Sequence, residues 1–303
     1  KHGTVGVVTE AGVLEITTFR TESGYADHRH PDQVTFVTDI REDLARRDFT
    51  INAMAFHPKT GYMDPFGGQR DLKSHVLRAV GDPVTRFTED ALRILRGVRR
   101  FRLEIDRPTY KAMNRLTELL DQLALERISS EMTQILCHMQ KGDLVRFRKI
   151  ILQVVPELHD SVGFQQHSPY HTYDVFTHTA YVVENVPGEL PLRWAALLHD
   201  IGKVIFRALS LDGRAHSQSG YEAMKEIIDQ PEILDCIRYH HKKELSGAKL
   251  DSNALAYTVY IADNIAAGAD RRTGEAEEDA KGFDKTLPLE NIFNLMNDNK
   301  KRY

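Results

Sequence analysis

Apolar and polar residues alternate at the start of the chain and change to a helical spacing further along. Residues 4–20 (TVGVVTEAGVLEITTFR) alternate, with a turn signal at Glu10–Gly12, and predict a β-hairpin. Between residues 85 and 157 the apolar positions recur every three or four residues, as at Leu92, Leu95 and Val98, which predicts helices. The pattern therefore predicts an α+β head followed by a mainly α-helical region.

The remaining segments are mixed. Residues 33–56 combine a short strand, QVTFV, with a helical stretch through RRDFTINAMAF. Residues 57–72 are rich in glycine and proline and predict a loop. A second unit begins near His167 and is helical almost to the end, and the tail from Gly274 is charged, then amphipathic, then polar.

Composition places the chain among ordinary globular proteins. Its 303 residues, 41% apolar and 28% charged, allow two or three domains. Two distant cysteines, Cys137 and Cys236, argue against a disulfide framework and fit a reducing compartment. No apolar run is long enough to span a bilayer and no signal peptide is visible, so we expect a cytoplasmic protein with no membrane partner.

The net charge of −4 means that any RNA-binding surface must be a local basic cluster. Arg96, Arg99 and Arg100 lie close together on one predicted helix, beside Arg93, and are candidate RNA contacts. A solvated helix face is the alternative interpretation of the same charges.

Two segments carry the most informative chemistry, RRDFTINAMAF (46–56) and EDALRILRGVRRF (89–101). On a helix, Asp90 and Arg93 are three residues apart and leave from one face. Asp90 would accept a hydrogen bond from the exocyclic amine of cytosine or adenine, and Arg93 would donate to the neighbouring ring nitrogen. Uracil and guanine carry a carbonyl at that place, so the pair predicts recognition of cytosine and adenine; a plain surface ion pair is the alternative.

Seven segments in register resemble the tRNA nucleotidyltransferase family, which comprises the bacterial CCA-adding enzymes and their poly(A) polymerase relatives. They are LEITTFR (14–20), YADHRHPDQVTF (25–36), EDLARRDFTINAMAF (42–56), DPFGGQRDL (64–72), LRAVGDP (77–83), RFTEDALRILRGVRRF (86–101) and ERISSEM (126–132). The resemblance implies a nucleotidyltransferase head that uses Mg²⁺ to add CMP and AMP, from CTP and ATP, to the 3′ ends of tRNA.

The resemblance also assigns roles to single residues. It implies that Asp90 and Arg93 form the amino-acid template for the base. Arg46, Arg47 and Asp48 would serve the phosphates and sugar of the incoming nucleotide, although Asp48 could instead cap the following helix. Glu15 would be a third acidic group beside the metals, with an exposed strand residue as the equal alternative. Glu126 and Arg127 would brace the template helix.

One departure from the family is large. The family holds its two metal ions with an Asp-x-Asp pair, and no Asp-x-Asp occurs in the first 150 residues here. The chain also starts without methionine, at Lys1. We therefore expect a truncated head that cannot add CCA unless residues upstream of Lys1 exist. The predicted domains are a head (1–72), a helical neck or RNA-binding region (73–160), an HD domain (161–275) and a tail (276–303).

The second unit contains a histidine-rich pattern. His178, the adjacent His199–Asp200 pair and Asp263 resemble the HD phosphohydrolase superfamily, and imidazole with carboxylate suits a divalent metal such as Mn²⁺ or Ni²⁺. The metal would activate water against a phosphoester, with His199 and Asp200 as catalytic residues. Further candidates are second-metal ligands His216, His240 and His241, which could equally be a solvated loop, phosphate-binding Lys203, and structural His171 and Asp174.

The stretch after Lys203 more closely resembles the HD nuclease of the type III CRISPR effector large subunit, and the shared LLHDIGK word at 197–203 could mark a fusion or a composite. Three interpretations remain open. The first is a CCA-adding nucleotidyltransferase with an HD domain, acting on tRNA or other RNA. The second is an HD nuclease or phosphodiesterase with an inactive nucleotidyltransferase remnant and CRISPR effector subunits as partners. The third is a non-catalytic RNA-binding module.

Overall fold

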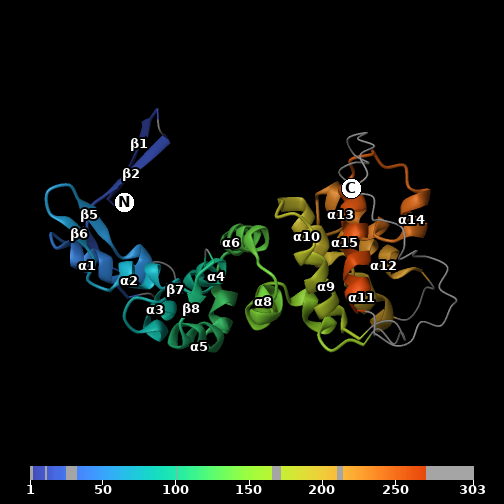
Figure 1. Ribbon diagram of the computed structural model, residues 1–303, viewed down its shortest axis with the longest axis horizontal. Coiled ribbons are helices and arrows are strands. Elements are labelled where there is room, and N and C mark those ends of the chain that lie inside the picture. Colours follow the sequence, from blue (N-terminus) through green and yellow to red (C-terminus); the bar gives the residue numbers. More distant parts are fainter. Residues whose placement is uncertain are drawn as a thin grey trace. The chain divides into compact units, whose positions relative to one another are not determined.

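The computed structural model describes residues 3–10, 12–24, 33–100, 102–165, 172–209 and 214–270. The chain divides into two compact units, residues 1–156 and 157–303, which are considered separately below (Figure 1). His171 and the tail from Gly274 lie outside the described residues, and the narrower predicted domain boundaries stay predictions.

Unit 1 begins with strands and continues with helices. Its strands are β1 (Thr4–Thr9), β2 (Gly12–Thr17), β3 (Arg20–Ser23), β4 (Gln33–Phe36), β5 (Ala55–His57), β6 (Gly61–Met63), β7 (Val76–Leu77) and β8 (Glu104–Ile105). Its helices are α1 (Ile40–Ala45), α2 (Gly68–Lys73), α3 (Pro83–Glu89), α4 (Leu92–Arg99), α5 (Arg107–Arg115), α6 (Leu125–His138), α7 (Asp143–Arg146) and α8 (Arg148–Val154), with 3₁₀ turns η1 (Thr50–Asn52) and η2 (Thr117–Gln122).

In the described part of unit 1 the strands form four separate two-stranded ladders. The predicted hairpin is confirmed as β1 and β2, antiparallel with Thr4 opposite Thr17. β3 pairs with β4 and β5 with β6, also antiparallel, whereas β7 and β8 are parallel. Apolar side chains of the first hairpin are exposed, 83% for Val8 and 57% for Leu14, so backbone pairing rather than burial holds this ribbon together.

The prediction of a helix through RRDFTINAMAF is wrong. After α1 the backbone of Asp48 accepts from the Val80 amide and Thr50 donates to the Arg78 carbonyl, so this segment pairs with residues 78–80 rather than with itself. Only η1 is helical, and the segment ends in β5. These tertiary bonds override the helical periodicity of the sequence.

The prediction of a loop over residues 57–72 is also wrong in part, because β6 and most of α2 fall inside it. Gly67 turns the chain with a φ of 76°, in the left-handed region that favours glycine. The Asp64 carboxylate then accepts from the amides of Gly68 and Gln69 at 2.7 and 2.9 Å, which satisfies the free donors at the start of α2.

Helices α3–α6 form the core of unit 1. The predicted apolar face of α4 is buried, since Leu92, Leu95 and Val98 are at most 8% exposed. Asp82 starts α3 by accepting from the Thr85 amide at 2.8 Å, followed by proline at the first helical position. Helix α4 then packs against α6, and α3 against α5.

Unit 2 is helical in its described part, as predicted. It contains the 3₁₀ turn η3 (Pro156–Ser161), which starts at the unit boundary, and α9 (Val175–Glu184), α10 (Leu190–Leu198), α11 (Ile201–Leu209), α12 (His216–Met224), α13 (Pro231–Tyr239), α14 (Lys242–Gly247) and α15 (Leu255–Asp270). Helix α15 packs on α9 and α13. In the described ranges no helix has both the length and the apolar character needed to cross a bilayer.

A buried carboxylate ties α1 to β3. Asp43 is 3% exposed and accepts from Arg46 Nη2 at 2.6 Å and from the Arg20 amide at 3.3 Å. Arg47 Nη2 approaches its second oxygen at 3.4 Å. Burial alone would raise the pKa of Asp43, but the Arg46 guanidinium outweighs it and the pKa falls below its usual value of 3.8. Asp43 thus fixes both arginines of the RRD segment.

Substituting Gly68→Ala should destabilise unit 1 by about 1–3 kcal/mol, because a Cβ there overlaps the Thr50 carbonyl oxygen, which is backbone and cannot move aside. Urea unfolding of the two proteins measures the difference. The control is Gly97→Ala, whose Cβ meets the flexible end of Met113 and which should cost less. Equal effects of the two substitutions would contradict this packing.

Substituting Asp43→Asn should lower the free energy of unfolding by about 1–3 kcal/mol at pH 7, since it removes the charged acceptor of several donors. The folded-state pKa is lowered, so the contribution is complete above the unfolded value near 3.8 and declines as the pH falls below it. Denaturation at pH 7 and pH 3 tests this. Glu42→Gln, at an exposed position of the same helix, should change little at either pH.

Candidate functional site

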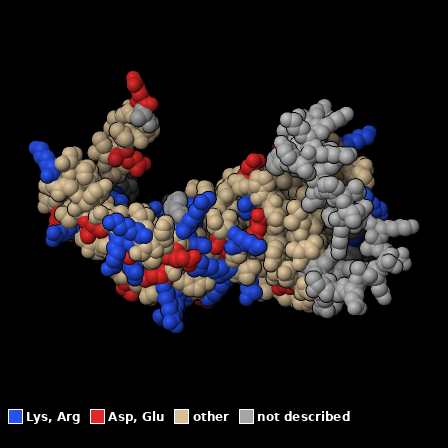
Figure 2. Space-filling view, viewed as in Figure 1, with Lys and Arg blue, Asp and Glu red and all other residues tan. Residues whose placement is uncertain are grey.

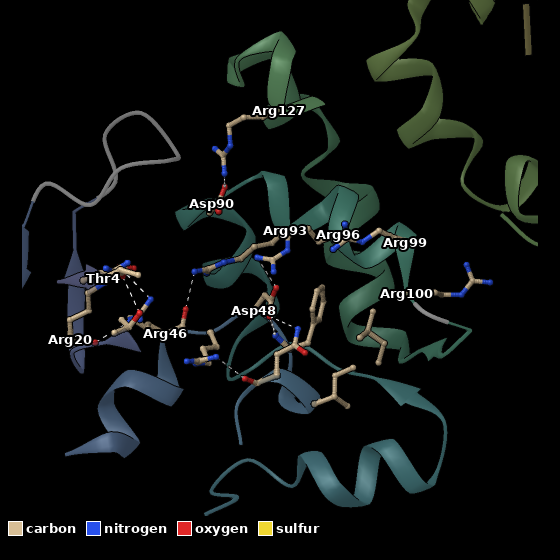
Figure 3. A pocket seen from close by; sticks show the side chains of 17 residues that line it. Thr4, Arg20, Arg46, Asp48, Asp90, Arg93, Arg96, Arg99, Arg100 and Arg127 are labelled. Atoms are coloured by element: carbon tan, nitrogen blue, oxygen red, sulfur yellow. Dashed lines mark hydrogen bonds and ion pairs between the residues drawn. The ribbon is translucent and has the colours of Figure 1, made fainter. Parts of the chain in front are cut away.

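A cleft of about 780 Å³ opens in unit 1, and eight of its seventeen lining residues are arginines (Figure 3). Its lining residues are Thr4, Thr17, Arg20, Glu22, Arg46, Arg47, Asp48, Phe49, Ile51, Asn52, Leu77, Asp90, Arg93, Arg96, Arg99, Arg100 and Arg127. Figure 2 shows further Lys and Arg side chains, interspersed with acidic ones, on one face of this unit. The cleft is therefore suited to a polyanionic ligand.

Arg93 is buried in the wall of the cleft, with its side chain only 8% exposed. Its Nη1 donates to Glu89 Oε2 and to the Arg86 carbonyl, both at 2.9 Å. Its Nη2 donates to the Arg46 carbonyl at 2.8 Å. Arg93 thus joins the α3–α4 turn to the RRD segment, as Figure 3 shows.

Asp90 does not lie on a helix with Arg93, contrary to the prediction of a common helix face. α3 ends at Glu89, and Asp90 is extended, with φ −142° and ψ 103°. Its Oδ1 accepts from the Leu92 amide at 3.1 Å and lies 3.6 Å from Arg127 Nη2. The break arises because Asp90 uses its carboxylate to start α4. Asp90 and Arg93 still line the same cleft.

The two arginines of the RRD segment differ in availability. Arg46 is 18% exposed in its side chain and is held by Asp43, by Glu22 Oε1 at 3.3 Å and by the Arg20 carbonyl at 3.0 Å. The Arg47 side chain is 44% exposed, with its bonds at 3.3–3.4 Å. Arg47 is therefore the arginine of this segment that can reach a ligand in the cleft.

Asp48 is only 5% exposed, and both its oxygens are engaged. Oδ1 accepts from the Phe49 amide at 2.8 Å and from Asn52 Nδ2 at 3.1 Å. Oδ2 pairs with Arg96 Nη1 at 3.0 Å. It does not cap η1 in the predicted manner, because Phe49 occupies the cap position without a side-chain bond.

The predicted RNA-binding arginines are also unequal. The Arg96 side chain is 40% exposed, whereas that of Arg99 is 15% exposed and pairs with Glu131 at 3.1 Å. Arg100 is 7% exposed, bonds to Asp143 at 2.6 Å and lies over the Phe147 ring. The ion pair and the ring contact bury Arg100, and its role as an RNA contact stays a prediction.

Glu15 lies on β2 opposite Gly6, is exposed, and is not among the residues that line the cleft. It shares the strand face of Thr17, two residues on, which does line the cleft. Arg20, Asn52 and Arg127 line the cleft as well, and of these the sequence assigned only Arg127, as a brace. A signal for Arg20 was present, since it ends the LEITTFR segment.

In unit 2 the predicted histidines and carboxylates come together. His178 Nε2 lies 2.9 Å from Asp263 Oδ1 and 3.6 Å from Asp200 Oδ2. His199 Nε2 lies 3.4 Å from Asp200 Oδ2. The ligand atoms of His178, His199 and Asp200 all lie within 4.8 Å of one another, and all three side chains are buried. Asp174, by contrast, caps α9.

A second group of three histidines lies on the other side of Asp200. His241 Nε2 and His240 Nε2 are 2.7 and 3.3 Å from His216 Nε2. Asp200 Oδ1 is 3.5 Å from His216 and 3.6 Å from His240. Asp263 Oδ2 is 3.7 Å from His241 Nδ1. Asp200 and Asp263 therefore each face both groups.

Backbone carbonyls fix the orientation of two of these rings. His199 Nδ1 donates to the Ala196 carbonyl and His240 Nδ1 to the Ile237 carbonyl, both at 2.8 Å, so each Nε2 faces Asp200. Burial, with neighbouring imidazoles, lowers the pKa of His240 and brings that of His241 to about 3. Burial also acts to lower the pKa of His199, but the Asp200 carboxylate outweighs it and raises that pKa.

The buried donor set fits a divalent cation. His199 Nε2 and Asp200 Oδ1 are buried and make no hydrogen bond among the described residues. Their separations from neighbouring donors exceed hydrogen-bond length, as expected of atoms that converge on a common ion. Lys203 Nζ pairs with Asp200 Oδ2 at 2.7 Å and helps hold the pKa of that carboxyl well below its usual range, against the effect of burial.

Comparison with known proteins follows this division. Residues 1–78 match the poly A polymerase head domain, and residues 170–268 match the HD domain. The chain is 49% identical over 138 residues to the CCA-adding enzyme of Lactobacillus helveticus, covering 45% of this chain and 35% of that enzyme. It is 48% identical over 141 residues to that of Ligilactobacillus salivarius, covering 45% and 34%. The chain thus spans about a third of these relatives' length.

Solved structures show the same relationship. The crystal structure of the Bacillus stearothermophilus CCA-adding enzyme in complex with CTP matches with a TM-score of 0.52 and 27% identity, covering 89% of this chain and 65% of that one. A tRNA-processing enzyme with CTP, at 21% identity and a TM-score of 0.57, shares the fold over 92% of this chain and 77% of its own. The chain therefore carries a match to the poly A polymerase head domain followed by a match to the HD domain, and it is similar to CCA-adding enzymes over part of its length.

Proposed function

We propose that unit 1 serves tRNA CCA addition, binding CTP and ATP as donors of CMP and AMP to tRNA 3′ ends. The observation that carries this proposal is the arginine-lined cleft in which the RRD segment meets the α3–α4 turn. The related Bacillus stearothermophilus enzyme was solved with CTP, and another CCA-adding enzyme with ATP. A nucleoside triphosphate supplies the charge that such a cleft favours.

Some residues of the cleft are proposed to contact the ligand, and others to hold the cleft in shape. Arg47 and Arg96, the more exposed arginines, are the proposed phosphate ligands, and Arg96 and Arg99 are proposed contacts for the tRNA backbone. Asp90 is the proposed acceptor for the exocyclic amine of the base. Arg93 would hold the α3–α4 turn against the RRD segment while it donates to the base.

The cleft carboxylates do not form a set for Mg²⁺. Glu22 pairs with Arg20 and Arg46, Asp48 with Arg96, and Asp90 with Arg127. Among the described residues, the groups with metal-ligand spacing occur only in unit 2. The role of Glu15 beside a metal stays a prediction.

Substituting Arg47→Ala should weaken CTP and ATP binding about tenfold, because it removes an exposed guanidinium that would donate hydrogen bonds to the phosphates. Isothermal titration calorimetry with each of CTP, ATP, GTP and UTP measures this change in affinity. Arg70→Ala is the matched control, since that side chain is 74% exposed and does not line the cleft. Equal binding of CTP, ATP, GTP and UTP, or unchanged binding in Arg47→Ala, would exclude the proposal.

For unit 2 we propose metal-dependent hydrolysis of a phosphoester. The observation that favours it is the position of Asp200 and Asp263 between two imidazole groups. His178, His199, His216, His240, His241 and both carboxylates would hold divalent cations such as Mn²⁺ or Ni²⁺. A bound cation would supply Lewis-acid activation of water and of the phosphoryl group. Lys203 would contribute positive charge for the substrate phosphate.

Substituting His199→Ala should abolish Mn²⁺-dependent cleavage of a nitrophenyl phosphodiester, with a loss of at least about a hundredfold, because it removes a buried ligand. Calorimetric Mn²⁺ binding should weaken in parallel. His159→Ala, at a histidine 78% exposed and bonded only to Asp160 among the described contacts, should retain both properties. Cleavage that survives either His199→Ala or chelation would count against this site.

The type III CRISPR interpretation of unit 2 and its effector-subunit partners stay predictions. Cleavage of single-stranded nucleic acid by the intact chain, sensitive to His199→Ala, is the result that would favour it over a phosphatase.

A further inference from the structure

In unit 2 the backbones of α11 and α12 touch at a pair of glycines. Gly202, the second residue of α11, faces the first turn of α12, where an added Cβ would overlap the His216 carbonyl oxygen and lie 2.7 Å from the Gly220 nitrogen. A Cβ added to Gly220 would lie 3.1 Å from the Gly202 nitrogen. The two helices can approach this closely only because neither residue has a side chain.

Neither glycine is needed for its own backbone conformation. Both lie inside helices, and neither has the positive φ that favours glycine. Glycine within a helix is less stable than alanine, so these two positions need another reason to be glycine. The close approach of the two backbones supplies that reason.

The contact joins the segments that carry Asp200 and His216. Asp200 directly precedes α11, and its carbonyl accepts from the Lys203 amide at 2.9 Å, which ties it to the first turn of that helix. His216 is the first residue of α12, and its Nε2 lies 3.5 Å from Asp200 Oδ1. The separation of the two helices therefore sets the distance between this imidazole and this carboxylate.

The His216 ring depends on its backbone position more than its neighbours do. The rings of His199 and His240 are each fixed by a bond from Nδ1 to a backbone carbonyl, whereas Nδ1 of His216 makes no hydrogen bond within the described ranges. The His216 side chain is also 24% exposed, whereas that of His240 is fully buried. The placement of α12 is therefore what brings His216 to the other two histidines of its group.

From this geometry we propose that Gly202 is a positioning residue for the three-histidine group of His216, His240 and His241. Its missing side chain lets α12 carry His216 to Asp200, so that the group can bind a divalent cation. This inference rests on the proposed cation binding by unit 2.

The other metal-ligand group should be independent of the glycine contact. His178 lies on α9, His199 follows α10 as its C-cap residue, and α9 packs against both α10 and α15. Asp263, on α15, lies 2.9 Å from His178. A purely structural glycine contact would affect both groups together, whereas a positioning role affects the three-histidine group alone.

The test is isothermal titration calorimetry of the full chain with Mn²⁺, in which we expect one binding event for each group. His216→Ala should remove the event that belongs to the three-histidine group. In Gly202→Ala, whose new Cβ pushes α12 away, the same event should weaken at least about tenfold while the other changes less than about twofold. Electron paramagnetic resonance of the bound Mn²⁺ should change in parallel, from a spin-coupled pair to an isolated ion.

Further variants separate positioning from stability. Gly220→Ala, whose Cβ makes the milder contact, should weaken the same event by about threefold. In the double variant of Gly202→Ala with His216→Ala, the remaining event should stay within about twofold of His216→Ala alone, because the glycine acts through that imidazole. Gly268→Ala, in α15 with open space around its Cβ, is the matched control and should leave both events unchanged.

The outcomes separate this inference from the proposed function. Two unchanged events in a folded Gly202→Ala, or equal weakening of both, overturns the positioning role while unit 2 remains a cation-binding unit. Where circular dichroism shows that Gly202→Ala has not folded, Gly220→Ala decides by the same criteria. A wild type that binds one cation, unaffected by His216→Ala, overturns the positioning role alone. A wild type that binds no Mn²⁺ overturns both.

Discussion

The cleft of unit 1 depends on one buried guanidinium. Arg93 joins the end of α3, through Glu89 and the Arg86 carbonyl, to the RRD segment, through the Arg46 carbonyl. A buried arginine with unsatisfied donors is costly, so each of these partners is constrained to its place. The two segments that were singled out in the sequence, 43 residues apart at their starts (46 and 89), meet because this side chain requires acceptors from both.

Unit 2 also buries charged groups, but they are acidic rather than basic. There the buried groups are carboxylates, Asp200 and Asp263, with imidazoles around both and the ammonium group of Lys203 beside Asp200. Burial lowers the pKa of His240 and brings that of His241 to about 3, whereas the Asp200 carboxylate raises the pKa of His199. The cleft carboxylates of unit 1 pair with arginines, whereas the buried carboxylates of unit 2 lie among imidazoles, which is the donor set of the proposed cation site.

The sequence predicted what depends on local pattern. The β1–β2 hairpin, the buried face of α4 and the helical nature of unit 2 all follow from apolar spacing. The helical periodicity was misleading in two places. The RRD segment pairs with the distant residues 78–80, and Asp90 interrupts the helix because its carboxylate accepts from the Leu92 amide at the start of α4. The histidines and carboxylates that the sequence singled out do lie together in unit 2. The exposure of each arginine could not be predicted, because the burial of Arg100 depends on its ion pair with Asp143, which is 43 residues away in the sequence.

This last distinction decides how the cleft can select a ligand. Arginines that are already paired, such as Arg46 and Arg93, use several of their donors within the protein and so fix the geometry of the cleft. An exposed group such as Arg47, whose own contacts are long, can contribute net binding to the proposed ligand. Exposed guanidiniums of this kind supply affinity for any polyphosphate, and that affinity falls as salt is added.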